Sequence, residues 1–337
     1  MKRAAATSAF LLLIGLAGAW VEWTSEEPVD LEGKVVLLQG DAESITAVRW
    51  IGEDSESAIT RKTDDRGAYY WVDYTRWSTP PLPSARSDDD TGEADAAPER
   101  VADRSAFKAA DKADALLASL SPMVAQRTLA VTDEDKLEAI GLTEPTATIE
   151  IDRGDRTQKL SVGGEAYGTR DYYVRHEETG KIYLVDRTLI QPLKYARTRL
   201  PDRSLFDVGR SDLTGSTVSD GTRTLSLVHV HPDDESKAGW AAADEPESVL
   251  AQPTTWLNKM LGLKGTRYAD PDSPPEGLED RFTVVLVTRD SRTSIAVKQV
   301  GADGDWYATS EHTRGLVKLV RSGASGLAED LDGLLSE

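Results

Sequence analysis

The chain has no cysteine, so disulfide bonds, thiolate nucleophiles and cysteine-ligated zinc or iron–sulfur centres are excluded. It also lacks the phosphate-binding glycine loop, the dinucleotide glycine fingerprint, the Gly-x-Ser-x-Gly elbow and the His-Glu-x-x-His helix. Only 4 histidines occur, which leaves few imidazoles for acid–base or metal chemistry. The sequence therefore predicts no catalytic residue, no cofactor and no metal.

Positive charge is also scarce. The chain carries 39 Lys and Arg against 58 Asp and Glu, which gives a net charge of −19 at pH 7. Such a surface repels phosphate backbones, so the composition argues against a nucleic-acid partner. A hydrophobic content of 39% supports a packed core, and 337 residues accommodate a terminal segment and about two domains.

The N-terminus contains an uncharged run from Ala4 to Val21 that follows Lys2 and Arg3. Its roughly 18 residues span about 27 Å as a helix, close to the thickness of a hydrocarbon core. Trp20 lies where an interfacial aromatic residue is expected. We predict that residues 1–23 anchor the chain in the inner (cytoplasmic) membrane as a single pass, with the body periplasmic.

The same segment also fits a cleaved signal peptide. Ala17-Gly18-Ala19 satisfies the small-x-small pattern of a cleavage site, and the most apolar stretch, 10–16, is short. The two alternatives differ in whether the mature protein keeps its anchor. Both place the body outside the cytoplasm.

The body contains many short runs rich in β-branched and aromatic residues, separated by turn residues, which predict strands. The predicted strands are 34–38, 45–51, 57–63, 68–75, 146–151, 158–163, 171–176 and 181–186. Between them, at about 83–104, prolines and an acidic cluster cannot bury enough apolar surface to fold. The acidic cluster is Asp88, Asp89, Asp90, Glu93 and Asp95. We predict that this segment is a disordered insert.

A helix is predicted directly after the insert. Phe107, Ala110, Ala113, Leu117 and Leu120 recur at steps of three or four residues, as on the buried face of a helix. Ser105 is the predicted N-cap, and Pro122 ends the pattern. This apolar stripe indicates core packing.

Parts of the pattern occur twice. Gly141-Leu142 matches Gly277-Leu278, and Leu160 with Val162 matches Ile295 with Val297. Tyr172-Tyr173 matches Trp306-Tyr307. Segment 187–193 matches 314–320, and segment 45–51 matches 224–230. The predicted helix of the second copy is 254–263. The sequence therefore predicts an α+β fold: two related units of mainly antiparallel strands with packed helices, 30–202 and 203–337, after the transmembrane helix.

The run 136–151, together with "KLSVGG", "DYYVRHEETGKIYLVD" and "LIQPL", resembles the bacterial "domain of unknown function 4340" family. The resemblance covers roughly 107–193 most clearly, and rests on hydrophobic alternation around Gly141, Leu142, Pro145 and Gly163. It implies an N-terminal membrane segment, a strand-rich extracytoplasmic body and an auxiliary role beside gliding-type ABC-transport components. It implies no catalytic residue.

"VHVHPDD", 228–234, is the strongest indication of enzyme chemistry. In a strand, His229 and His231 would share one face, a spacing that suits two imidazoles on a metal, with Asp233 or Asp234 as a third ligand. The alternative is that both histidines are structural. Similarly, "GADGDW" at 301–306 contains clustered carboxylates but is better explained as a hairpin turn.

Aromatic residues cluster at 69–77. In a strand, Tyr69, Trp71 and Asp73 lie on one face, whereas Tyr70 and Tyr74 lie on the other with Val72. Core and cross-strand packing explain such a cluster, and the alternative is that one face fills a core while the other contacts a sugar or a protein.

These observations predict a membrane-anchored envelope protein that acts as a non-catalytic binding or scaffold component. The predicted partners are inner-membrane or envelope proteins, including ABC-transport components. An exported metal-dependent hydrolase and a carbohydrate-binding module are the alternatives.

Overall fold

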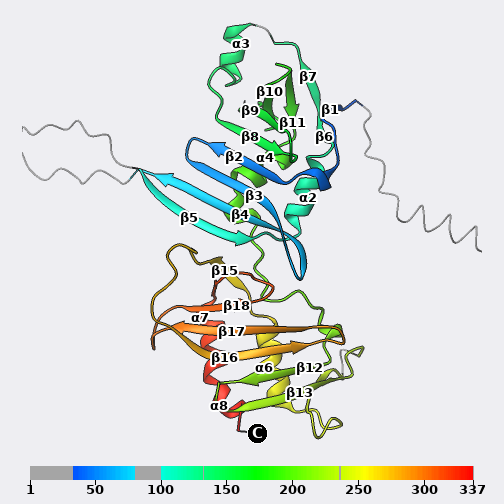
Figure 1. Ribbon diagram of the computed structural model, residues 1–337, viewed down its shortest axis with the longest axis vertical. Helices are drawn as coiled ribbons and strands as arrows, with labels where there is room; N and C mark the ends of the chain where they lie inside the picture. Colours follow the sequence, from blue (N-terminus) through cyan, green and yellow to red (C-terminus); the bar gives the residue numbers. More distant parts are fainter. Residues whose placement is uncertain (1–32, 80–99, 132, 235–236, 337) are drawn as a thin grey trace, which may run out of the picture.

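The computed structural model describes residues 33–79, 100–131, 133–234 and 237–336. They form two halves along the long axis, each built on one antiparallel sheet with helices against it (Figure 1). The α+β class is therefore confirmed. The predicted anchor and most of the predicted insert lie outside these residues. Within the described ranges, no helix has both the length and the apolar character needed to traverse a bilayer.

The first half contains a nine-stranded sheet in the order β5-β4-β3-β2-β8-β9-β10-β11-β7 and a small β1-β6 ladder. Its strands are β1 (Val35–Leu38), β2 (Ala47–Gly52), β3 (Ser55–Asp64), β4 (Gly67–Ser78), β5 (Val101–Lys108), β6 (Met123–Ala125), β7 (Arg127–Leu129), β8 (Ala147–Asp152), β9 (Thr157–Glu165), β10 (Tyr172–His176) and β11 (Ile182–Val185). Its helices are η1 (Ala42–Ser44), α2 (Lys112–Ser119), α3 (Glu134–Ala139), α4 (Arg187–Lys194) and α5 (Ala196–Arg199).

The second half contains an eight-stranded sheet in the order β14-β13-β12-β16-β17-β18-β19-β15. Its strands are β12 (Gly215–Ser219), β13 (Thr224–Val230), β14 (Gly239–Ala242), β15 (Gly265–Tyr268), β16 (Leu278–Val287), β17 (Arg292–Val300), β18 (Trp306–Ser310) and β19 (Val317–Leu319). Its helices are η2 (Arg210–Asp212), α6 (Ala251–Leu261), α7 (Arg321–Glu329) and α8 (Leu331–Leu334).

Alternating side chains explain how each sheet forms. In β8, Ile149 and Ile151 are fully buried, whereas Glu150 between them points to the opposite face. There Glu150 lies 3.0 Å from Arg49 of β2 and 2.6 Å from Lys159 of β9. Apolar burial therefore holds one face of the sheet, and cross-strand ion pairs cover the other.

The two sheets share a strand order. The set β12-β13-β14 occupies the places of β2-β3-β4, β16 to β19 those of β8 to β11, and β15 that of β7. The pairs Ile149–Leu160 and Val284–Ile295 are equivalent in register. Gly141 and Gly277 adopt φ of 69° and 70°, which glycine tolerates without a side-chain clash. The first sheet differs by one additional strand, β5.

Two of the predicted repeat matches are wrong. Segment 45–51, which contains β2, is equivalent to β12 and not to segment 224–230, which forms β13. The reason is that β12 lies beside β16 as β2 lies beside β8. Segment 314–320 contains strand β19, so it matches β11, and α4 is instead matched by α7. Both errors are slips of one element along a repetitive pattern.

The boundary of the insert and the start of the following helix are also wrong. Val101 to Lys108 form strand β5, so the predicted insert extends too far and Phe107 lies in a strand. The helix α2 begins at Lys112, with Asp111 rather than Ser105 as its N-cap residue. Phe107 still faces the core, since alternation in a strand buries it as well as helical spacing would.

Gly163 in β9 gives a stability prediction. A Cβ at this position would lie 2.4 Å from the Ile140 carbonyl oxygen, whereas at Gly164 it would lie 3.5 Å away. We expect Gly163→Ala to lower the free energy of unfolding by about 1–3 kcal/mol, because the backbone of the Gly141 turn must move. Gly164→Ala is the matched control and should change stability much less. Urea unfolding followed by circular dichroism measures both, and equal midpoints would contradict the clash.

Candidate functional site

The end strands of the two sheets, β5 and β15, meet where the halves join. Tyr268 of β15 is buried there, with its ring centroid 6.1 Å from that of Phe107 and 6.4 Å from that of Trp71. Tyr268 and Val317 belong to the hydrophobic core of the first half, although both lie in the second sheet. The second half therefore completes the core of the first.

A buried charge cluster, Lys108, Asp202 and His312, lies beside Tyr268. One carboxylate oxygen of Asp202 is 2.9 Å from Lys108 Nζ and 2.7 Å from His312 Nε2. The other ring nitrogen of His312 lies 3.3 Å from Asp207. Burial raises the pKa of Asp202, but hydrogen bonds from His312 and Lys108 outweigh burial and hold that pKa well below its usual range.

The hairpin between β3 and β4 makes a second polar contact across the junction. Arg314 donates to both carboxylate oxygens of Asp64, at 2.5 Å and 2.9 Å, and lies over the ring of Tyr69. These hydrogen bonds lower the pKa of Asp64 to about 2. Nearby, Arg66 donates to the carbonyl oxygen of Arg292. The junction thus combines apolar burial with charge-assisted hydrogen bonds.

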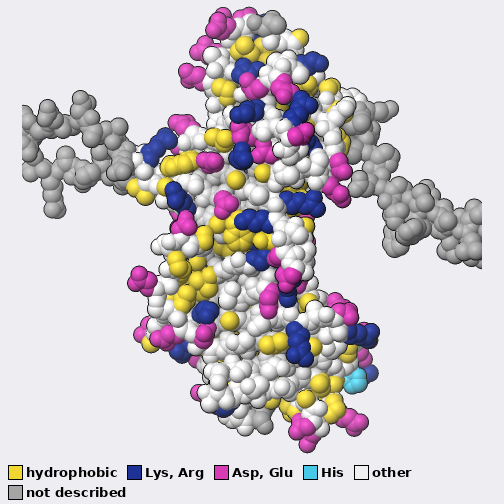
Figure 2. Space-filling view, in the orientation of Figure 1, with side chains coloured by type: hydrophobic (Ala, Val, Ile, Leu, Met, Phe, Trp, Pro, Cys, Tyr) yellow, Lys and Arg dark blue, Asp and Glu magenta, His cyan; other side chains and the backbone are white. Residues whose placement is uncertain are grey.

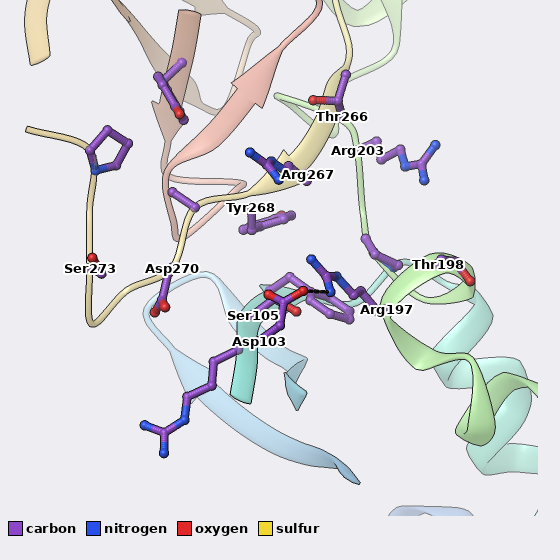
Figure 3. A pocket seen from close by; sticks show the side chains of 16 residues that line it. Asp103, Ser105, Arg197, Thr198, Arg203, Thr266, Arg267, Tyr268, Asp270 and Ser273 are labelled. Carbon is purple, nitrogen blue, oxygen red and sulfur yellow. Dashed lines mark hydrogen bonds and ion pairs between the residues drawn. The ribbon is translucent and has the colours of Figure 1, made fainter. Parts of the chain in front are cut away.

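A pocket of about 420 Å³ opens at this junction (Figure 3). Its lining comes from β5, from the segment 197–203 after α4, and from β15 with the loop that follows it. Aromatic and proline side chains form the apolar part: Phe107, Pro201, Tyr268, Pro275 and Tyr307. The pocket therefore requires both halves.

Arginine dominates the polar part of the pocket. Arg197 pairs with Asp103 at 2.5 Å, as the dashed line in Figure 3 shows. Arg104, Arg203 and Arg267 also line the pocket, and none of their guanidinium groups forms a hydrogen bond or ion pair with a described residue. In a chain of net charge −19, this is a local excess of positive charge suited to an anionic group.

Two hydroxyl groups at the pocket are buried. The Ser105 hydroxyl has no hydrogen-bond partner among the described residues. The Tyr268 hydroxyl lies beside the backbone N–H of Lys108 without a well-formed hydrogen bond, and burial raises its pKa. Buried polar groups normally find partners, so these two are available to a ligand or to water.

The predicted two-histidine strand is not present. Strand β13 ends at Val230 and His231 has φ of 53°, so the alternation that would place both imidazoles on one face stops before His231. His229 stacks on Trp240 with 4.6 Å between ring centroids, and its Nδ1 lies 3.0 Å from the Leu213 carbonyl oxygen. His229 and Asp233 do line one cavity of about 670 Å³. Across the described ranges, no group of three His, Asp or Glu side chains is arranged to hold a metal.

The predicted faces of the aromatic strand are confirmed. Val72 and Tyr74 are buried in the core, and Trp71 lies on the opposite face, where its Nε1 donates to Asp73. That face is used within the chain, because Trp71 contacts Tyr268 and Tyr69 contacts Arg314. The hairpin turn at 301–306 is also confirmed, since Val300 N–H donates to the Asp305 carbonyl oxygen between β17 and β18.

The family model described as "Domain of unknown function (DUF4340)" matches residues 100–281, more than half of the chain. The chain belongs to this family. The matched span runs from β5 into β16, so it includes every lining residue of the junction pocket except Tyr307. No curated protein and no solved structure matches the chain.

The sequence did not predict the junction pocket. Its arginines come from β5, from the segment 197–203 and from β15, which are distant in sequence and meet only through folding. The one signal was the arginine-rich run "ARTRLPDR", 196–203, in an otherwise acidic chain. That run contains two of the four pocket arginines.

Removal of the Asp202 carboxylate should destabilise the protein. The Asp202 and Lys108 side chains are only 13% and 12% exposed, so Asp202→Ala leaves a buried ammonium without its carboxylate. We expect a loss of about 3 kcal/mol in the free energy of unfolding. Asp332→Ala removes a carboxylate that is 90% exposed and should change stability by less than about 1 kcal/mol. Guanidinium unfolding measures the difference, and equal losses would contradict the role of the cluster.

The junction should weaken only in strong acid. Asp64 and Asp202 have lower pKa values in the folded protein than the 3.8 of a free Asp side chain, so the unfolded chain binds protons more readily. Their contribution is complete above about pH 4 and is lost as the pH falls from there toward 2. A double variant, Asp64→Asn with Asp202→Asn, should therefore show a shallower loss of thermal midpoint below pH 4. An unchanged acid slope would contradict this assignment.

Proposed function

We propose that this chain is a membrane-tethered envelope protein that binds other proteins at the junction between its two halves. The observation that carries the proposal is the convergence of two open sheet edges, β5 and β15, on a pocket with three arginines that lack ion-pair partners. Exposed sheet edges and accessible arginine side chains are features of protein recognition sites. The role is docking of a partner rather than turnover of a substrate.

The surface at the junction supports this assignment. Figure 2 shows hydrophobic side chains gathered at mid-height of the molecule, with Lys and Arg side chains beside them. In Figure 1 this height is where β4 and β5 approach β15. Apolar and basic groups side by side suit a partner that offers both apolar and acidic side chains.

The N-terminal sequence supports the tether. The uncharged run from Ala4 to Val21 would hold the chain in the inner membrane with the two halves on the periplasmic side. The resemblance to the family supports inner-membrane transport components of the ABC type as the partner class. A tether restricts the search for such partners to the membrane surface, which raises their effective concentration.

We also infer that the two halves arose by duplication of one α+β unit. The shared strand order and equivalent registers support this inference, as do the matched positive-φ glycines. The added strand β5 distinguishes the first unit, and it forms one wall of the pocket. A repeated fold with one modified edge suits a scaffold whose binding site lies between its copies.

Site-specific photo-crosslinking in native membranes tests the proposal. A photoreactive residue at Thr266, which is exposed and lines the pocket, should capture one envelope protein identifiable by mass spectrometry. The same residue at Tyr167, fully exposed but outside the pocket, should not capture it. Introducing Arg267→Glu into the Thr266 variant should abolish capture if the junction binds the partner.

Two outcomes would count against this function. One is identical crosslinking from Thr266 and Tyr167, since the pocket would then confer no selectivity. The other is release of the chain from membranes by alkaline extraction, which removes peripheral proteins but leaves spanning anchors in place.

A further inference from the structure

We propose that the occupant of the junction pocket is an extended, acidic polypeptide segment that adds a strand to the free edge of β5. This inference rests on the proposed binding function and names the chemistry of its partner. It depends on three properties of the pocket: unpaired backbone groups, excess positive charge and apolar walls.

The register of β5 shows which backbone groups are free. Ala109 N–H donates to the Tyr70 carbonyl oxygen at 2.9 Å, and opposite residues in an antiparallel ladder alternate between bonded and non-bonded pairs. Counting back from Ala109, every second residue of β5 bonds to β4. Arg104 and Ala106 therefore direct their N–H and C=O groups away from β4, toward the pocket side of the strand.

The chain itself shows that this edge accepts a partner. Asp202 N–H donates to the Lys108 carbonyl oxygen at 2.9 Å, and Ala110 N–H donates to the Leu200 carbonyl oxygen at 2.9 Å. A short antiparallel bridge thus already covers the end of the edge next to Lys108. Beyond it, no described backbone group pairs with Arg104 or Ala106 along the pocket. A peptide would continue a pairing that the fold has begun.

The excess of arginine at the pocket favours a negatively charged peptide. Arg104, Arg203 and Arg267 form no ion pair with a described residue, although Arg267 is near enough to Asp305 to interact with that carboxyl electrostatically, and Asp103 is paired with Arg197. Asp270 is the remaining carboxylate of the pocket, and it accepts the backbone N–H of Asp272. Acidic side chains would therefore gain two or three charge-assisted hydrogen bonds, whereas basic ones would be repelled.

The walls of the pocket determine how acidic and apolar residues are spaced along the peptide. In an extended strand, successive side chains point to opposite faces, so alternate residues of the peptide meet different surroundings. One set would reach the arginines, and the other would contact the partly exposed side chains of Pro201 and Pro275. The structure thus favours alternation of acidic and apolar residues in the partner.

The test uses the full-length protein in detergent and labelled ten-residue peptides, with binding measured by fluorescence anisotropy. A peptide that alternates Glu and Val should bind saturably. Its version with N-methyl groups on every second residue cannot pair with an edge strand and should bind about tenfold or more weakly. A Lys–Val peptide should not bind. Because the N-methyl groups lie on the peptide, this comparison does not depend on the folding of any variant.

Variants of the protein locate the site. Arg203→Glu and Arg267→Glu should each weaken binding of the Glu–Val peptide by about tenfold. Arg127→Glu is the matched control and should leave binding unchanged. Arg127 is exposed on β7, which lies at the opposite end of the nine-stranded sheet from β5. Circular dichroism spectra identical to that of the unaltered protein would exclude misfolding.

Two results would overturn the inference. Equal binding of the N-methylated and unmodified peptides excludes strand addition. If tripolyphosphate then also displaces the peptide completely, the pocket is a site for small anions. Failure of the Glu–Val peptide to bind excludes an acidic strand. If the Thr266 crosslink persists in any of these cases, the docking function stands and only the chemistry of the partner is wrong.

Discussion

The burial of Tyr268 against Phe107 and Trp71 is the contact on which the arrangement of the two halves depends. The ring comes from the end strand of one sheet and completes the core that covers the other. A buried aromatic side chain removes a large apolar area from water, so separation of the halves would expose it at substantial cost. Because the junction pocket is lined from both sheets, it exists only while this contact holds.

The charge cluster beside Tyr268 restricts the relative orientation of the two halves at that contact. Apolar burial tolerates small rotations, but Lys108, Asp202 and His312 satisfy one another only in one relative position of β5 and the loop before β19. Burying such charges is costly, and their pairing offsets that cost without necessarily exceeding it. We therefore regard the cluster as fixing the relative orientation of the halves, and the apolar contact as holding them together. Orientation matters here, since the edges of β5 and β15 must converge to shape the pocket.

Local patterns in the sequence predicted most elements but not their assembly. Strand β8 could be predicted because one face is buried and every second residue is apolar. Strand β5 was missed because Phe107 fits both a helical stripe and a strand, and the acidic composition upstream suggested disorder. The repeat was correctly aligned at β9 and β10, whose buried residues recur in β17 and β18. It was misaligned by one element where neighbouring strands have similar sequences. The pocket could not be predicted, because charge on separate segments carries no information about which segments meet.

The ladder between β4 and β5 also determines which changes the chain tolerates between these two strands. Ser78 and Val101 face each other across that ladder, so the fold holds the two ends of the intervening stretch at neighbouring positions whatever its length. The entropy of closing a loop grows only logarithmically, and doubling its length costs about 0.6 kcal/mol. A shorter or longer connection at this point would thus leave both sheets undisturbed. The same property makes it a suitable place for a genetically encoded tag.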